Sequence, residues 1–132
     1  MEPIKIVVHC ADGRIIKGYT QDFARNRPSF HVRWLPTAHD SVEVLVKDLK
    51  GVFFVQDFEG DPNYREQKDF PDGVKHQGKR VEVTFQDGEV IIGSTLSYDR
   101  QGLGFFIIPS DPKWNTLRIF AVSQAVSKVR FL

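Results

Sequence analysis

The sequence predicts an all-β protein made of two tandem five-stranded small barrels, joined by a linker that carries a short helix. Three observations support this fold class: an internal repeat, apolar residues that alternate along short segments, and an Asp-Gly pair after the first segment of each copy. The predicted units are a first barrel over residues 1–57, the linker over residues 58–78 and a second barrel over residues 79–132. With 41% hydrophobic and 27% charged residues, the chain can bury a core and stay soluble, which excludes a disordered or fibrous protein.

The internal repeat relates residues 11–18 to residues 86–93 at an offset of 75 positions. The same offset, with a later shift of two residues, relates further pairs: Phe23 and Tyr98, Arg25 and Arg100, Phe30 and Phe105, and 52–55 and 129–132. Because the matches keep their order and fall on residues that carry the pattern, we interpret the two halves as copies of one unit.

Each copy is expected to form five strands, because short apolar segments with a period of two are separated by turn residues. The expected strands are 6–10, a return strand through Gly18, 30–34, 42–46 and 51–55, followed by 81–85, a return strand through Gly93, 105–108, 117–122 and 128–132. Asp12-Gly13 and Asp87-Gly88 predict tight hairpin turns, since glycine adopts a positive φ readily. Gly18 and Gly93 predict a bulge or a sharp bend. Short bent strands favour closure into a barrel, which leaves no free edge.

The linker between the two copies is acidic and contains Pro62, Pro71 and three glycines. Asp61-Pro62 is typical of a helix N-cap followed by proline at the first helical position. We therefore expect a short helix over residues 62–68.

The pattern resembles the first half of an Sm-like domain, in which an apolar-x-apolar segment, Asp-Gly and a glycine five residues later follow one another. The segment from Asp87 to Asp99 is the closer match, and Leu49-Lys50-Gly51 resembles the turn between the last two Sm strands. The resemblance implies tandem Sm-like small-barrel modules of a poorly characterised bacterial family, in the cytoplasm. The second copy departs from the family because it has no Asn where Sm proteins hold a uridine, and Asn26 of the first copy stands in a different register.

The residues give no indication of catalysis. No metal-site spacing, phosphate loop or nucleophile elbow is present, and the single cysteine, Cys10, lies in an apolar run. We therefore expect neither an enzyme nor a cofactor nor a metal site. Eighteen basic and seventeen acidic residues leave a formal charge of +1, which removes the usual electrostatic reason for a membrane partner, and no apolar run is long enough to cross a bilayer.

The candidate binding residues cluster before and along the third strand of the first copy. Arg25, Arg27, His31 and Arg33 form a candidate basic patch for phosphate or carboxylate groups. The alternative is a solvated loop whose arginines pair with acids such as Asp22. Trp114, in a turn-like insertion, either caps a barrel end or presents an aromatic ring to a partner.

The second copy is apolar where the first is polar. Phe106 stands in the place of His31, Ile108 in that of Arg33, and Ile92 in that of Lys17. A soluble barrel has little reason to expose these three side chains together. We expect this face to be an interface, buried against the first barrel and the linker helix or in a homodimer.

The leading function is therefore a non-catalytic, regulatory protein-interaction module. Its main candidate residues are Arg25, Arg27, Arg33 and Trp114. The alternative is an RNA-binding Sm-like protein, in which phosphates and bases are contacted by Arg25, Asn26, Lys50 and Arg100 and an unpaired base stacks on Trp34 or Trp114.

Overall fold

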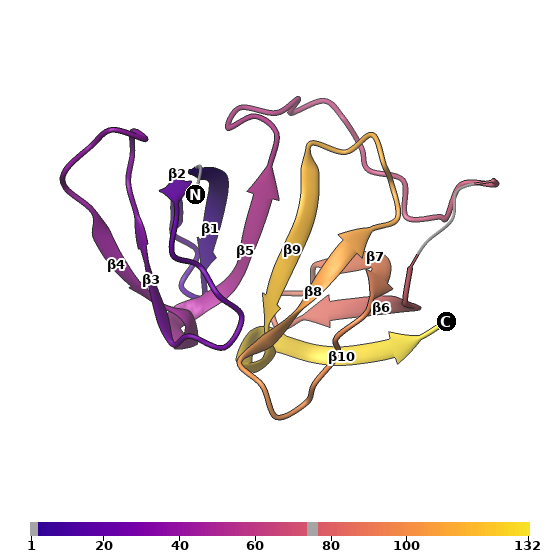
Figure 1. Ribbon diagram of the computed structural model, residues 1–132. Helices are drawn as coiled ribbons and strands as arrows, with labels where there is room; N and C mark the ends of the chain where they lie inside the picture. Colours follow the sequence, from indigo (N-terminus) through magenta and orange to yellow (C-terminus); the bar gives the residue numbers. More distant parts are fainter. Residues whose placement is uncertain (1–2, 74–76) are drawn as a thin grey trace.

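The computed structural model describes residues 3–73 and 77–132, and in these ranges it contains β-strands and two single 3₁₀ turns but no α-helix (Figure 1). The first half contributes β1 (Ile4–Cys10), β2 (Ile15–Thr20), β3 (Ser29–Val32), β4 (Val42–Leu45), η1 (Val46–Asp48) and β5 (Leu49–Val55). The second half contributes β6 (Lys79–Phe85), β7 (Val90–Thr95), β8 (Gly104–Pro109), β9 (Thr116–Val122), η2 (Ser123–Ala125) and β10 (Val126–Phe131). The all-β class is confirmed, and both halves have the same order of elements.

The two Asp-Gly turns form where the sequence predicts them. Gly13 has a φ of 96° and Gly88 a φ of 94°, which is the left-handed region that favours glycine. The carboxylate of Asp12 accepts a hydrogen bond from the backbone N–H two residues later at 3.0 Å, and that of Asp87 does the same at 3.0 Å. Each turn therefore fixes the register of its hairpin, β1–β2 or β6–β7.

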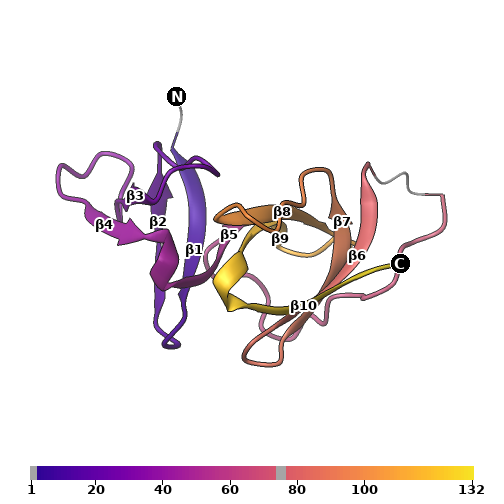
Figure 2. The same ribbon diagram turned by 90° about the horizontal axis from the view of Figure 1, so that it is seen from below.

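The prediction of two closed barrels is wrong. Eight strands form one open antiparallel sheet in the order β10-β6-β7-β8-β9-β5-β1-β2, and β3 and β4 form a separate hairpin. The outer edge of β5 is paired along its length with β9 of the second half, so it cannot close onto β4 (Figures 1 and 2). An isolated β-bridge between Tyr19 and Arg33 links the hairpin to β2, and Phe30, Val32 and Val44 of the hairpin pack into the core of the first half.

The pairing of β6 with β7 runs through Gly93 without a shift in register, so the predicted bulge is absent there, and Gly93 instead lies where β7 meets β8. These strands pair only at Gly93 with Pro109 and at Ser94 with Ile108. A Cβ atom on Gly93 would lie 2.2 Å from the carbonyl oxygen of Ile108. The missing side chain thus allows the two backbones to approach closely.

Alternate residues of the central pair β5–β9 face two hydrophobic cores. On β5, Val52 and Phe54 belong to the core of the first half, whereas Phe53 belongs to that of the second. On β9, Phe120 enters the first core and Ile119 the second. The two halves are therefore joined by a continuous sheet with apolar packing on both faces.

The predicted linker helix over residues 62–68 does not form. Asp61 closes one turn, in which its carbonyl oxygen accepts a hydrogen bond from the N–H of Tyr64 at 3.0 Å. The chain is then held to the second half by the carboxylate of Asp111, which accepts hydrogen bonds from the Tyr64 hydroxyl at 2.5 Å and the Gln67 N–H at 2.9 Å. Burial opposes ionisation of Asp111, but these hydrogen bonds outweigh it and lower the pKa of the carboxyl group. The tertiary anchor therefore overrides the local helix signal.

Candidate functional site

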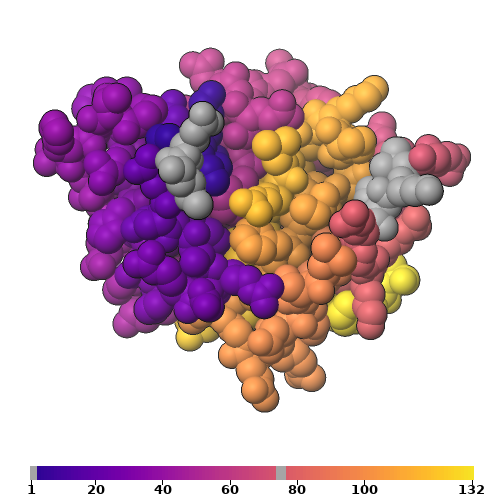
Figure 3. All heavy atoms as spheres, viewed as in Figure 1, coloured from indigo at the N-terminus to yellow at the C-terminus, as the bar shows by residue number. Residues whose placement is uncertain are grey.

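The joint between the halves is built around Phe23, in the loop after β2. Its ring centroid lies 5.1 Å from that of Phe120, 5.5 Å from that of Phe54 and 6.1 Å from that of Phe106. Phe54 comes from the first half, whereas Phe106 and Phe120 come from the second. Figure 3 shows the purple first half in contact with the orange second half.

Arg118 of β9 lies over this aromatic cluster. The central carbon of its guanidinium is 4.3 Å from the ring centroid of Phe54 and 4.8 Å from that of Phe106. Burial lowers the pKa of Arg118, and within residues 3–73 and 77–132 no acidic side chain forms an ion pair with it. The stacking fixes the plane of a cation that has no counter-charge in this part of the chain, which is a suitable arrangement for an incoming carboxylate.

A groove of about 580 Å³ opens beside this guanidinium. Its walls include Leu96 and Ile108, which are 74% and 46% exposed. Arg25, from the loop of the first half, faces the same groove. The groove therefore combines two arginines with an exposed aliphatic surface, and it can accept an anionic group that lies next to an apolar one.

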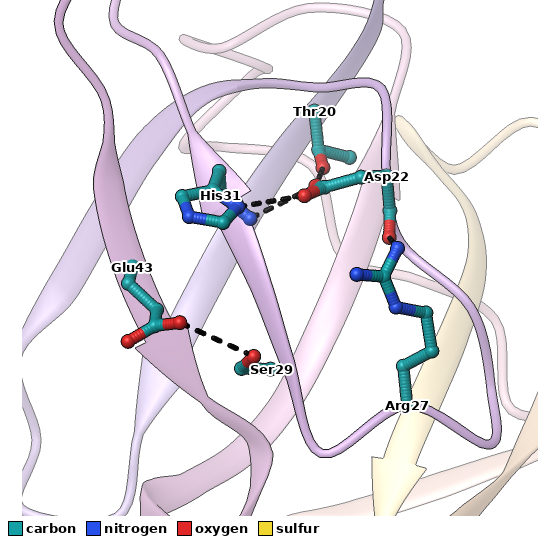
Figure 4. A network of polar contacts seen from close by, with 6 residues as sticks. All are labelled: Thr20, Asp22, Arg27, Ser29, His31 and Glu43. Atoms are coloured by element: carbon teal, nitrogen blue, oxygen red, sulfur yellow. Dashed lines mark hydrogen bonds and ion pairs between the residues drawn. The ribbon is translucent and has the colours of Figure 1, made fainter.

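The other basic residues of the predicted patch form hydrogen bonds within the first half, and Figure 4 shows Arg27 and His31 among them. His31 Nδ1 lies 2.7 Å from a carboxylate oxygen of Asp22, and Arg27 donates to the Asp22 carbonyl at 3.2 Å. Arg33 donates to the carbonyl of Ala38 at 2.5 Å. Burial opposes ionisation of Asp22, but hydrogen bonds that include two from His31 outweigh it and lower the pKa of Asp22. These contacts order the loop, so the four basic residues do not form one free surface.

The remaining candidate side chains lie in different parts of the molecule. Arg25 and Asn26 line a second hollow of about 470 Å³ next to the groove. Arg100 lines a third hollow of about 510 Å³ beside β10. Trp114 is half-buried against the second core and borders a hollow of about 440 Å³ near the linker. Of these four residues, only Arg25 lines the groove.

Lys50 is occupied by contacts within the protein. Its ammonium group forms ion pairs with Asp87 at 2.7 Å and with Glu89, and it lies 5.0 Å from the ring centroid of Phe85. Burial opposes the charged form of Lys50, but the two carboxylates outweigh it and raise the pKa of the amine. Lys50 therefore connects β5 to the β6–β7 turn and is not placed to contact a phosphate.

The three residues predicted as an interface have different environments. Ile92 is 9% exposed, Phe106 packs against the first core, and Ile108 remains exposed in the groove. Sequence reasoning did not identify Arg118 or Leu96. The local sequence does not distinguish Arg118 from any other arginine in a strand, because its stacking partner Phe54 is distant in sequence.

Two general features of the described ranges bear on function. No three His, Cys, Asp or Glu side chains among them gather closely enough to hold a metal ion. No helix in this part of the chain is long and apolar enough to cross a membrane.

Comparison with known families places the chain in a family of unknown function. The model of DUF6982, a family of unknown function, matches residues 2–132, so the chain belongs to DUF6982. The comparisons give no support to the resemblance to Sm-like proteins. No curated protein and no solved structure matches the chain.

Proposed function

We propose that this member of DUF6982 is a non-catalytic protein-interaction module that binds a regulatory partner through the groove beside Arg118. The observation that carries the proposal is the stacked Arg118 guanidinium, which faces the groove without a carboxylate partner in the described part of the chain. The proposed ligand is a segment of a partner protein in which an acidic side chain stands next to an aliphatic one.

Charge and shape favour this ligand. A guanidinium fixed on aromatic rings loses little conformational freedom when it binds a carboxylate in a bidentate manner. Arg25 adds a second positive charge at the same groove. Leu96 and Ile108 offer exposed aliphatic surface within reach of the same ligand, which adds hydrophobic contact to the ion pair.

The lining of the groove favours binding over catalysis. Among the residues that the structure describes, the titratable side chains in the lining are two arginines, with no imidazole, carboxylate or thiol. Ser94 and Ser97 lie in the lining, but no base there is placed to activate their hydroxyl groups.

The test uses a labelled peptide, Gly-Leu-Asp-Leu-Gly, and the same peptide with Asn in place of Asp. Binding is followed by two-dimensional NMR of the complete chain with the peptide at up to millimolar concentration. We expect the Asp peptide to shift the methyl signals of Leu96 and Ile108 and the side-chain N–H signal of Arg118. We expect the Asn peptide to bind at least tenfold more weakly.

Two variants separate the groove from general electrostatics. Arg118→Gln keeps a long polar side chain on the rings but removes the charge, and it should lower the affinity for the Asp peptide about tenfold or more. Arg130→Gln is the matched control, because Arg130 is also on a strand but pairs with Glu82 at 3.0 Å. Equal binding of the two peptides, or equal effects of the two variants, would refute the proposal.

RNA binding is the second candidate, and the 71% exposure of Trp34 favours it. An exposed indole can stack on an unpaired base, and Arg25 and Asn26 share a hollow that can accept polar groups. Titration with a uridine-rich oligonucleotide tests this alternative. Binding that weakens steeply with salt and is lost in Trp34→Ala would support it, whereas no binding at low salt would remove it.

A further inference from the structure

The free edge of β10 corresponds to an edge that is already occupied within the chain. β5 is the last strand of the first half, and β9 pairs along its outer edge. β10 is the last strand of the second half, and it stands at one end of the eight-stranded sheet with β6 as its neighbour. The place beside β10 that corresponds to β9 is therefore open.

The aromatic packing of the two halves shows the same correspondence. The rings of Phe23 and Phe54 are 5.5 Å apart at 74°, and those of Tyr98 and Phe131 are 5.5 Å apart at 76°. Phe23 is also covered by Phe120 of β9, at 5.1 Å. At the corresponding position, Tyr98 and Phe131 line the hollow of about 510 Å³.

Corresponding residues of the two halves differ in exposure because β9 covers β5 and no strand of the described chain covers β10 in the same way. Phe54 is 2% exposed, whereas Phe131 is 48% exposed. Val52 is fully buried, whereas Val129 is half-buried and lines the hollow. The second half thus leaves open a hollow, lined in part by Tyr98, Val129 and Phe131, at the position that Phe120 fills in the first half.

The backbone of β10 is oriented to accept another strand. The N–H of Leu132 donates to the carbonyl of Arg80 on β6 at 2.9 Å. Since the direction of the backbone groups alternates along an antiparallel strand, the N–H and C=O groups of Val129 and Phe131 point away from β6. These are the groups that a strand added at the edge would bond.

We propose that β10 accepts an added β-strand from a protein partner, with an aromatic side chain seated in the hollow beside Tyr98 and acidic residues on either side of it. The aromatic residue takes the place that Phe120 has in the first half. The acidic residues lie on the opposite face of the added strand, where one of them faces Lys128, and Arg130 on that face is already paired with Glu82. Arg100 adds positive charge at the hollow itself.

The same charges disfavour a second copy of the chain as the occupant. Two β10 strands paired antiparallel about Val129 would place Lys128 opposite Arg130, so neither copy would offer a carboxylate directly opposite Lys128. Strand β4, which corresponds to β9, carries Glu43 at the position that corresponds to Phe120, so it would offer a carboxylate instead of a ring to the hollow.

The test uses a peptide derived from β9 itself. The peptide Thr-Leu-Arg-Glu-Phe-Glu-Val has the sequence of β9 with Ile119→Glu and Ala121→Glu, and the chain is used complete. Fluorescence anisotropy of the labelled peptide gives the affinity, and two-dimensional NMR locates the site. We expect saturable binding, with the largest shifts in the backbone of 127–132 and in Tyr98.

Backbone methylation of the peptide provides a matched pair of controls. In the register of β5 with β9, the phenylalanine of the peptide pairs with Val129, so its N–H faces β10. N-methylation of this phenylalanine should weaken binding at least tenfold. N-methylation of the glutamate before it places the methyl group on the outer edge and should change the affinity less than threefold.

Charge reversal provides an independent variant in the protein. Lys128→Glu alters an exposed side chain that takes no part in the β6–β10 hydrogen bonds. It should weaken binding of the acidic peptide and strengthen binding of a peptide with lysines in place of the glutamates. Arg118→Gln should leave this binding unchanged, which separates it from the groove of the proposed function. Three results would overturn the proposal: no binding, equal effects of the two methylated peptides, or a chain whose molar mass by light scattering shows self-association that the peptide does not reverse.

Discussion

Phe54 provides the most direct test of the way in which β9 covers the first half. The side chain is 2% exposed and its ring faces Phe23, Phe106 and the guanidinium of Arg118, two of which come from the second half. Phe54→Ala removes a buried ring at the joint, where the surrounding strands are paired on both sides and can collapse only in part. Phe131→Ala removes the corresponding ring in the second half, which has no such cover.

The expected magnitudes differ because of burial. A fully buried Phe→Ala change costs about 3–5 kcal/mol, since a cavity adds to the lost transfer free energy. Phe131 is 48% exposed, so Phe131→Ala loses roughly half of the transfer free energy and leaves no closed cavity, or about 1 kcal/mol. At roughly 3–4 °C per kcal/mol for a chain of this size, the melting temperature should fall by about 9–20 °C for Phe54→Ala and by about 3–4 °C for Phe131→Ala.

The assay is urea denaturation of both variants and the parent chain, followed by circular dichroism and tryptophan fluorescence. Both variants should keep the parent's far-UV spectrum, because the total stability expected for this length is roughly 7–20 kcal/mol. Equal losses in the two variants would refute the reasoning, because they would mean that β9 does not shield Phe54. Non-coincident transitions of the two probes in Phe54→Ala would show that the variant no longer unfolds in a single two-state step.

Two further predictions concern close packing and pH. Gly93→Ala should lower the free energy of unfolding by about 1–3 kcal/mol, because the new Cβ would lie 2.2 Å from the Ile108 carbonyl oxygen. Gly51→Ala should lower it less, since that Cβ would lie 3.0 Å from the Phe120 carbonyl oxygen. Equal losses in chemical denaturation would contradict the close approach of β7 and β8 at Gly93. Lys50→Met should cost about 1–2 kcal/mol near neutral pH, since it leaves two carboxylates without their cation. Because the folded state raises the pKa of Lys50, the stabilisation is fully present below pH 10.5 and is lost as the pH rises through the folded-state pKa. A difference in stability between variant and parent that persists above that pKa would contradict the ion-pair assignment.

The sequence allowed the strands and turns to be predicted but not the manner in which they pair. The Asp-Gly turns depend on local backbone preferences, and they form where the pattern places them. The closed barrels were wrong because the outer edge of β5 has two candidate partners. Its own half offers β4 and the second half offers β9, and no local pattern ranks them. The linker helix was wrong because Asp111, far along the chain, binds the segment in a non-helical conformation.

The candidate site was predictable only in part. Arg25 and Ile108 were identified from charge and from an unexplained apolar position, and both line the groove. Arg118 could not be identified, because its importance depends on two phenylalanine rings that reach it from other strands. Lys50 was placed among the RNA contacts, and the structure pairs it with two carboxylates of the second half instead.

Local sequence was sufficient for the all-β class, the hairpin turns and the alternation that divides each strand into two faces. These properties depend on residues close together in the chain, where backbone preference and a period of two act directly. Long-range packing settled that the halves share one open sheet, that a stacked arginine faces a groove, and that β10 keeps a free edge. Those outcomes depend on competition between distant strands for the same hydrogen bonds and the same apolar surface, and pairing energies of this kind are set by contacts that the local pattern does not encode.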